Sequence, residues 1–204
     1  MVGKEVSVKQ VLKEVEKDRS FYENSGGGIT LSGGEPLMQI RFARKLLRGC
    51  RLKGLHTVLQ TCGYALWKPF KSVLKYVDLL FFDVKEMNPA KHREFTGVSN
   101  ELILNNLERA SHLGIPISVR VPVIPSYNDL FWNFEKMGKF FSKLENIQEV
   151  KLLPYNRFAE SKYVGLGIEY KLKSLKSPKA NRLNYLKKLL CTYGLVAEYD
   201  STIL

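Results

Sequence analysis

The sequence predicts an α/β fold in which helices cover a parallel β-sheet. Along the 204 residues, short segments with the composition of strands alternate with longer segments that have the spacing of amphipathic helices. The strand segments are almost continuously apolar, which is typical of strands buried on both faces of a parallel sheet. This alternation fits a barrel, a part of a barrel or an open, doubly wound sheet.

Six segments are predicted to be strands. They are short, rich in β-branched and aromatic residues, and mostly bounded by residues that favour turns. These segments are residues 28–33, 54–61, 78–85, 115–125, 147–155 and 195–200. No linker or repeat interrupts the series, so we expect a single domain that spans residues 1–204.

Six further segments have apolar residues at the spacing of helices. They are residues 7–18, 36–50, 68–77, 100–114, 129–144 and 177–194. Ser7 and Gln10 are placed as a capping box for the first helix. Ser177 is expected to cap the last helix, with Pro178 at its first position. The segment of residues 156–176 fits neither pattern, and long connections of this kind tend to be functional or mobile.

The composition is that of a globular protein with a basic surface. Hydrophobic residues make up 45% of the chain, charged residues make up 25%, and the formal net charge is +12. The Lys and Arg residues are spread along the predicted helices without a recognition motif for nucleic acid, so we expect no nucleic-acid partner. No apolar run approaches the roughly 20 residues of a membrane helix, and the N-terminus lacks a signal-peptide pattern. We therefore expect a cytoplasmic protein without a membrane partner.

The cysteines and histidines are not spaced as metal ligands. Cys50, Cys62 and Cys191 lie far apart, and none belongs to a C-x-x-C pair. The three histidines are equally scattered along the chain. We expect reduced thiols and no metal ligands within this chain.

Glycine and polar residues gather where five of the predicted strands end. They are Gly33, Gly34 and Glu35 at the first strand, Thr61, Cys62 and Gly63 at the second, Asp83 and Lys85 at the third, Arg120 in the fourth, and Pro154, Tyr155 and Asn156 at the fifth. The carboxyl ends of parallel strands meet at one edge of a sheet, where α/β proteins build ligand sites. The sequence therefore predicts a ligand site that spans this edge.

The residue types at this edge indicate the chemistry of the ligand. Paired glycines let the backbone approach a ligand closely. Glu35 suits an ammonium group, whereas Lys85 and Arg120 suit a carboxylate or ribose oxygens. A ligand with an amino group, a carboxylate and a sugar would satisfy all of these residues.

Two of these features also have a purely structural interpretation. Asp83 and Lys85 could form an internal salt bridge at the end of a strand. Glu35 could be a carboxylate that is favoured at a helix N-terminus by the helix dipole. Neither interpretation explains why five strand ends carry such residues together.

Five motifs, taken in order and spacing, resemble those of the glycyl-radical-enzyme activating enzymes. They are "SGGGITLSGGEPLMQ", "LQTCGYA", "FFDVKEMNPAKHREFTGVSNELILNNL", "ISVRVPVIPSYND" and "LLPYNRFAESKY". These enzymes are radical S-adenosylmethionine (SAM) proteins, and their best-known member activates pyruvate formate-lyase. The motifs "TCGYA" and "LLPYNR" look closer to the activating enzymes of glycerol-dehydratase-like enzymes. The resemblance runs from about Lys4 to the last predicted helix.

The resemblance implies a partial, TIM-like (β/α)6 barrel and an oxidoreductase that works under anaerobic conditions. In the family, a 4Fe-4S cluster binds SAM, and one electron from reduced flavodoxin or ferredoxin cleaves it to methionine and a 5′-deoxyadenosyl radical. That radical removes a hydrogen atom from a glycine Cα of the partner, a glycyl radical enzyme.

Matching motifs carry the family's SAM-binding residues onto this sequence. The implied SAM residues are Gly33, Gly34 and Glu35 for the amino group, Asp83, Val84 and Lys85 for the ribose and methionine side, Arg120 for the polar groups, and Asn156 for the adenosine. Family members commonly have Asp where this chain has Gln60. With Thr61 and Asp83 that Asp helps to bind a monovalent cation, so the Gln puts a cation site here in doubt.

The family's C-x-x-x-C-x-x-C iron-binding motif does not occur in the 204 residues. In the family it follows a barrel strand and precedes the first helix predicted here. We therefore expect no catalytic cluster cysteines, no first barrel strand, and a chain that is inactive alone. The alternative is a module that binds SAM or docks a partner without radical chemistry.

Overall fold

The computed structural model describes residues 4–158 and 160–201, and these residues form one six-stranded, fully parallel sheet. The strands are β1 (Gly28–Leu31), β2 (His56–Thr61), β3 (Leu79–Asp83), β4 (Ile117–Val123), β5 (Ile147–Pro154) and β6 (Ala197–Tyr199). They lie side by side in the order of the sequence. All six strands lie within the segments predicted from the sequence.

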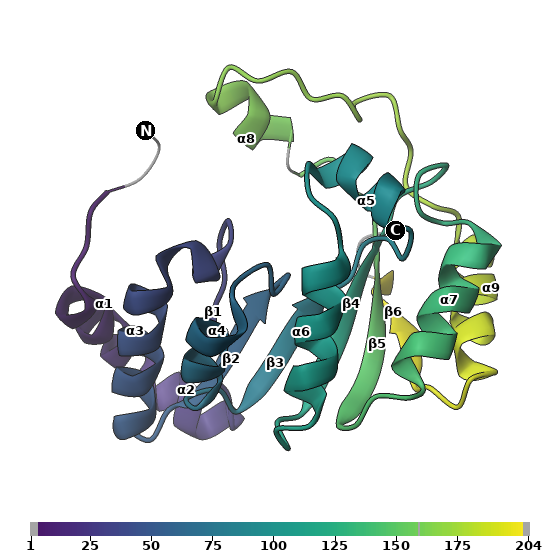
Figure 1. Cartoon of the computed structure of the whole chain (residues 1–204). Coiled ribbons are helices and arrows are strands. Elements are labelled where there is room, and N and C mark those ends of the chain that lie inside the picture. Colours follow the sequence, from purple (N-terminus) through teal and green to yellow (C-terminus); the bar gives the residue numbers. More distant parts are fainter. Residues whose placement is uncertain (1–3, 159, 202–204) are drawn as a thin grey trace.

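Helices connect the strands and flank the sheet (Figure 1). They are α1 (Val8–Val15), α2 (Arg19–Ser25), α3 (Ile40–Leu52), α4 (Trp67–Leu74), α5 (Pro89–Thr96), α6 (Glu101–Ser111), α7 (Phe131–Phe141), α8 (Glu160–Gly165) and α9 (Ala180–Cys191), with 3-10 turns η1 (Glu16–Asp18) and η2 (Pro36–Gln39). The predicted capping box is present, because the Ser7 side chain accepts from the Gln10 N–H while the Gln10 side chain accepts from the Ser7 N–H.

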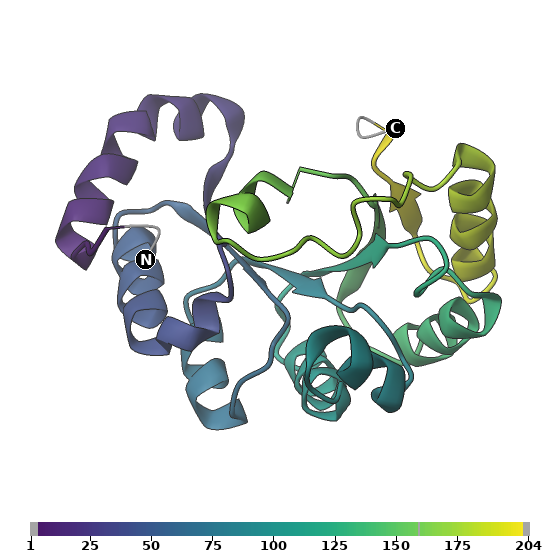
Figure 2. The same ribbon diagram turned by 90° about the horizontal axis from the view of Figure 1, so that it is seen from above.

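The strand order distinguishes a partial barrel from a doubly wound sheet. A doubly wound sheet reverses its order at a switch point, whereas this order runs from β1 to β6 without reversal. Right-handed crossovers in one direction place the connecting helices on one face of the sheet. Figure 2 shows these helices as an arc around the strands, with the segment of residues 156–176 lying across the strand ends. The predicted partial barrel is therefore confirmed.

Alternation along the strands divides the side chains between the helix-facing core and the inner face of the arc. In β3, Leu80 and Phe82 are fully buried, and the Phe82 ring lies 6.5 Å from that of Phe70 in α4. Phe81 and Asp83 alternate with them and are only half-buried. Because paired residues of neighbouring strands point to the same side, their partners Gln60, Ser118 and Arg120 share this inner face.

Three local features differ from the sequence prediction. Helices α2 and α5 were not predicted, because their sequences, RSFYENS and PAKHREFT, have few apolar residues and none at a regular helical spacing. The 156–176 segment contains the short helix α8. The prediction that Ser177 caps the last helix with Pro178 at its first position was wrong. Helix α9 begins at Ala180 with Lys179 at the N-cap, and Pro178 is buried before it.

Candidate functional site

The predicted strand-end residues do come together at the carboxyl edge of the sheet. Thr61, Asp83 and Pro154 are the last residues of β2, β3 and β5, and Gly33 follows β1 by two positions. Arg120 lies in the middle of β4, but its register partner is Asp83. The parallel sheet therefore places residues from five strands along one edge, in agreement with the expectation.

Glu35 links the turn after β1 to the end of β2. Its Oε1 accepts from the Leu37 N–H at 3.0 Å and from the Thr61 hydroxyl at 2.5 Å. Its Oε2 accepts from the Cys62 N–H at 2.9 Å. Both carboxylate oxygens therefore have partners within the chain, which supports the structural interpretation of Glu35 as a carboxylate at a helical N-terminus.

Gly33 and Gly34 present open backbone to a cavity of about 890 Å³. Gly33 has a φ of +137°, a conformation that favours glycine. A Cβ built on either glycine would meet no atom within 4 Å, so the space beside both residues is empty. Their peptide groups can therefore be approached closely by a ligand from the cavity.

Arg120 places a half-buried cation on the inner face. Its guanidinium carbon lies 3.5 Å from the centroid of the Phe81 ring. Its Nε is buried and has no hydrogen-bond partner among the residues that the structure describes. Burial lowers the pKa of this guanidinium, although the charges of Asp83, Glu149 and Asp200 oppose the shift. A buried donor without a partner is unfavourable, and the guanidinium of the half-buried Arg120 suits an anionic group.

Asp83 is the carboxylate beside this cation. Burial raises its pKa, while the charges of Lys85 and Arg120 and a hydrogen bond from Gln60 oppose the rise. The Gln60 Oε1 also accepts from the Ser32 hydroxyl at 3.1 Å. Gln60 therefore bridges the turn after β1 to the end of β3, which sequence spacing did not reveal.

Lys85 lies just beyond β3, beside the cavity under the 156–176 segment. This cavity has a volume of about 750 Å³, and Tyr127 and Tyr163 also line it. No carboxylate of the described residues lies within ion-pair distance of the Lys85 ammonium. The charge of Lys85 nevertheless reaches the site, because it favours the ionised forms of both Asp83 and Cys62.

The remaining predicted residues have local partners. The Thr61 hydroxyl accepts from the Gly63 N–H at 2.9 Å while it donates to Glu35. Val84 is 2% exposed, and its N–H donates to the Arg120 carbonyl, so only its backbone borders the site. The Asn156 Oδ1 accepts from the Phe158 N–H at 3.0 Å, within its own turn.

The 156–176 segment is anchored by a tyrosine pair that the sequence analysis missed. The hydroxyl oxygens of Tyr155 and Tyr170 lie 2.9 Å apart, and the Tyr155 hydroxyl donates to the Leu172 carbonyl at 2.8 Å. Burial and the bond to Tyr155 raise the pKa of Tyr170 to about 12. Because the two tyrosines are 15 positions apart in a stretch without periodicity, no spacing pattern could have paired them.

The donor set of the described residues does not fit an iron–sulfur cluster. Cys50 is buried in α3, Cys191 is exposed on α9, and Cys62 is half-buried at the site edge. Burial, the Glu35 hydrogen bond and the Glu35 charge raise the pKa of Cys62 to about 11, so its thiol is protonated at neutral pH. Across residues 4–158 and 160–201, no three His, Cys, Asp or Glu side chains gather as a metal-binding group.

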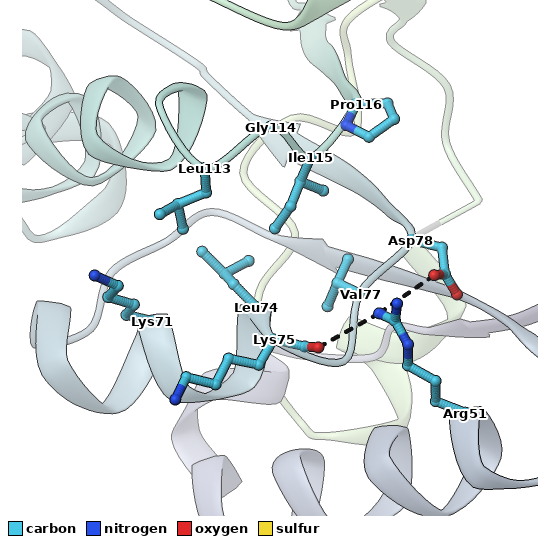
Figure 3. A pocket seen from close by; sticks show the side chains of 10 residues that line it. All are labelled: Arg51, Lys71, Leu74, Lys75, Val77, Asp78, Leu113, Gly114, Ile115 and Pro116. Carbon is cyan, nitrogen blue, oxygen red and sulfur yellow. Dashed lines mark hydrogen bonds and ion pairs between the residues drawn. The ribbon is translucent and has the colours of Figure 1, made fainter.

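A smaller cavity lies at the opposite edge of the sheet, before β3 and β4 (Figure 3). It has a volume of about 400 Å³, and Arg51, Lys71 and Lys75 line it with apolar residues. Arg51 pairs with Asp78 at 3.3 Å. Lys71 and Lys75 lie at the end of α4, where the helix dipole favours cations, so this cavity needs no ligand to explain its charge.

A model of the radical SAM superfamily matches residues 2–139. The chain belongs to the radical SAM superfamily. Within the superfamily it groups with glycyl-radical-enzyme activating enzymes, because it is 36% identical over 194 residues to the pyruvate formate-lyase 1-activating enzyme of Escherichia coli K12, covering 94% of this chain and 79% of that one. The superfamily uses SAM and a 4Fe-4S cluster. No helix of the described part of this radical SAM protein has the length and apolarity to cross a membrane.

Further relatives are also activating enzymes. The chain is 41% identical over 199 residues to the (2S)-3-sulfopropanediol dehydratase activating enzyme of Klebsiella oxytoca, covering 97% of this chain and 61% of the relative. It is 43% identical over 192 residues to the trans-4-hydroxy-L-proline dehydratase activating enzyme of Clostridioides difficile, covering 93% and 63%. This radical SAM protein thus spans less than two thirds of the length of these two relatives.

The fold is shared with a solved domain of a pyruvate formate-lyase-activating enzyme from Bacteroides vulgatus. That structure superposes with a TM-score of 0.73 at 28% identity, and the match covers 86% of this chain and 99% of the solved one. A radical SAM methyltransferase from Sphaerobacter thermophilus shares the fold at 17% identity, with a TM-score of 0.69 over 95% of this chain and 56% of that one.

Proposed function

We propose that this chain binds SAM at the carboxyl edge of its sheet and takes part in activating a glycyl radical enzyme. The observation that carries the proposal is the open backbone of Gly33 and Gly34 at one end of an edge that also holds Arg120, whose Nε has no hydrogen-bond partner among the described residues. Membership among the activating enzymes supports it. SAM has the amino group, carboxylate and ribose that these residues suit.

The amino group of SAM is proposed to lie over the turn after β1 that contains Gly33 and Gly34, called the glycine turn below. The peptide carbonyls of Gly33 and Gly34 would accept hydrogen bonds from the ammonium group, because both peptides border empty space. Glu35 and Thr61 would hold that turn against β2 through their mutual hydrogen bond. The net negative charge of the Glu35 carboxylate would favour a cation nearby even though its oxygens have partners.

The other polar groups of SAM are proposed to face the ends of β3 and β4. Arg120 and Lys85 would face the carboxylate, and Asp83 would accept hydrogen bonds from the ribose hydroxyls. The backbone of Val84 would line the ribose, and Asn156 would lie by the adenosine. This order follows the register of the strands, in which Asp83 and Arg120 are paired.

When bound in the family, SAM supplies the 5′-deoxyadenosyl radical that removes a hydrogen atom from a glycine Cα of the partner. The part of this chain in the reaction is to bind and orient SAM and, through the 156–176 segment, to shield the strand ends from water (Figure 2). We propose a glycyl radical enzyme as the protein partner and reduced flavodoxin or ferredoxin as the electron donor. We also propose an anaerobic, cytoplasmic setting without membrane or nucleic-acid partners, which the three free cysteines suit.

A second candidate is a module that binds SAM or docks a partner without radical chemistry. The cysteines favour this candidate, because the described residues do not bring three cysteines together as ligands for a cluster. Anaerobic reconstitution with iron and sulfide separates the two candidates. A 4Fe-4S signal in electron paramagnetic resonance that changes with SAM supports radical chemistry by the chain itself, and its absence supports the second candidate.

Calorimetric titration with SAM tests the binding that both candidates share. Arg120→Met is expected to weaken SAM binding at least tenfold, since it removes the cation while keeping much of the side-chain volume. Arg51→Met is the matched control, because Arg51 lies at the opposite edge of the sheet and is expected to leave binding unchanged. Equal binding by the wild type and Arg120→Met would refute the proposed site.

A further inference from the structure

The chain after β3 leaves the sheet because of Pro122. The last hydrogen bond of the β3–β4 ladder runs from the Val84 N–H to the Arg120 carbonyl at 2.9 Å. In a parallel ladder the next bond would come from the N–H of residue 122 to the Val84 carbonyl. Proline has no N–H, so the ladder ends at this point. The next residue of the departing chain is Lys85.

Three buried asparagine side chains hold the departing chain in place of the ladder. The Asn128 Nδ2 donates to the carbonyl oxygens of Lys85 and Pro122, both at 2.7 Å. The Asn100 Nδ2 donates to the Glu86 carbonyl at 2.7 Å. The Asn133 Oδ1 accepts from the Met87 N–H at 2.9 Å. Three consecutive residues are thus each fixed by one amide, and the amides come from the N-cap of α6, the turn before α7 and α7 itself.

The asparagines are buried, and two of them are themselves fixed by further hydrogen bonds. None is more than 3% exposed. The Asn128 Oδ1 accepts from the Ile124 N–H at 2.8 Å, and the Asn133 Nδ2 donates to the Asn128 carbonyl at 2.8 Å. Asn128 and Asn133 thus have partners on both ends of the amide and have one orientation, so they transmit their own position to the backbone that they hold. The Asn100 Oδ1 has no hydrogen-bond partner among the described residues, so Asn100 is held by its burial and by its bond to Glu86.

We propose that Asn100, Asn128 and Asn133 are positioning residues that keep the Lys85 ammonium at the SAM site. The inference rests on the proposed function, in which Lys85 faces the ligand. Lys85 has no ion-pair partner within the described residues, so the backbone alone determines where its long side chain begins. Its charge acts on Asp83 and Cys62, which belong to two neighbouring strand ends. If the backbone of residues 85–87 were less firmly held, Lys85 would keep its charge, but its ammonium group would move away from the ligand.

A double-mutant cycle with SAM separates positioning from general stability. Asn128→Ala is expected to weaken SAM binding about tenfold in calorimetry, and Lys85→Met is expected to weaken it at least as much. In the Lys85→Met background, Asn128→Ala is expected to change the dissociation constant less than twofold. An equal loss in both backgrounds would overturn the inference, because Asn128 would then act without Lys85.

A second readout needs no ligand. Reductive methylation with ¹³C-formaldehyde labels the lysines, and Lys85→Met identifies the signal of Lys85. We expect this signal to be shifted from those of exposed lysines in the wild type and to collapse onto them in Asn128→Ala. Asn146→Gly is the control, because Asn146 also donates its amide to a backbone carbonyl, that of Ser111, far from the site. Glycine suits the φ of +58° at this position, so the substitution removes the amide without backbone strain.

The two readouts distinguish the inference from the function on which it rests. One outcome refutes the proposed function but keeps the positioning role. In it, Asn128→Ala collapses the Lys85 signal, while Lys85→Met and Arg120→Met leave SAM binding unchanged. An unchanged Lys85 signal in Asn128→Ala refutes the positioning role. If Asn128→Ala does not fold, Asn100→Ala removes only one of the hydrogen bonds and is judged by the same two criteria.

Discussion

The Thr61 hydroxyl donates a hydrogen bond of 2.5 Å to the Glu35 carboxylate, which joins the ends of the first two strands. The same carboxylate accepts from the backbone N–H groups of Leu37 and Cys62. A single side chain therefore fixes the glycine turn, the start of η2 and the turn after β2. This explains how two glycines can lie beside a cavity without the turn collapsing into it.

Glu35→Ala is expected to destabilise the protein by about 2–3 kcal/mol, because it removes a helical cap and leaves buried donors without an acceptor. Urea unfolding measures the loss. Glu145→Gln is the control, since Glu145 is exposed and forms an ion pair with the exposed His112. An unfolding free energy equal to that of the wild type would contradict this function of Glu35. SAM should also bind more weakly, and tight binding unchanged by Glu35→Ala would count against the proposed site.

Gly34→Ala separates ligand binding from stability. The added Cβ meets no atom within 4 Å and the backbone is not left-handed there, so unfolding free energy should stay within about 0.5 kcal/mol of the wild type. SAM binding should weaken at least tenfold, because the methyl group enters the space that the ligand needs. Gly33→Ala is the contrast, since its φ of +137° makes the substitution strained even without ligand. Unchanged SAM affinity in Gly34→Ala would place the ligand elsewhere.

Much of this edge could be predicted from the sequence, because each strand can be recognised from the residues within it. Alternation located the strands, and the parallel sheet then brought Gly33, Asp83 and Arg120 to one edge. What could not be predicted depends on contacts between distant residues. Nothing in the spacing pairs Asn128 with Lys85, which is 43 positions away. Helix α5 was missed for a related reason, because its Asn88 cap and single buried residue give almost no apolar periodicity.

Gln60 provides a test of the cation site that the family resemblance implies. In this chain Gln60 donates to Asp83, and the Thr61 hydroxyl is already engaged by Glu35 and Gly63. Potassium should therefore leave the melting temperature of the wild type unchanged at constant ionic strength. Gln60→Asp places a second carboxylate beside Asp83 and raises the pKa of Asp83 further by like-charge repulsion, which a cation relieves.

The measurement is thermal unfolding of both proteins in potassium chloride and in tetramethylammonium chloride, whose cation is too large for such a site. Potassium should raise the melting temperature of Gln60→Asp by several degrees, roughly the effect of 1 kcal/mol in a domain of this size. The same potassium effect on the wild type would show that Gln60 does not remove the site. No effect on either protein would show that the geometry here does not form one.

Glu86 should make stability fall as pH rises. Burial raises its pKa above the ordinary value of 4.5, and hydrogen bonds from Asn88 and Met87 only partly oppose the shift. In the unfolded chain Glu86 loses its proton near pH 4.5, whereas in the folded protein it keeps it to higher pH. The unfolded state therefore binds fewer protons in that interval, so the contribution of Glu86 to unfolding free energy decreases with rising pH until the folded pKa is passed.

Glu86→Gln removes this decrease while keeping the Oε1 that accepts from the Asn88 N–H at 2.7 Å. It also removes the ionisable group whose Oε2 is buried without a partner among the described residues, so no charge has to be buried there. The variant should therefore be more stable than the wild type at pH 7, by on the order of 1 kcal/mol. The difference in unfolding free energy should grow from pH 4.5 upward and then level off. Comparing the two proteins at each pH cancels the titration of Asp83, which is common to both. If the unfolding free energies of the two proteins instead ran parallel across the whole pH range, Glu86 would lose its proton at the same pH in the folded and unfolded states. Its burial would then not raise its pKa.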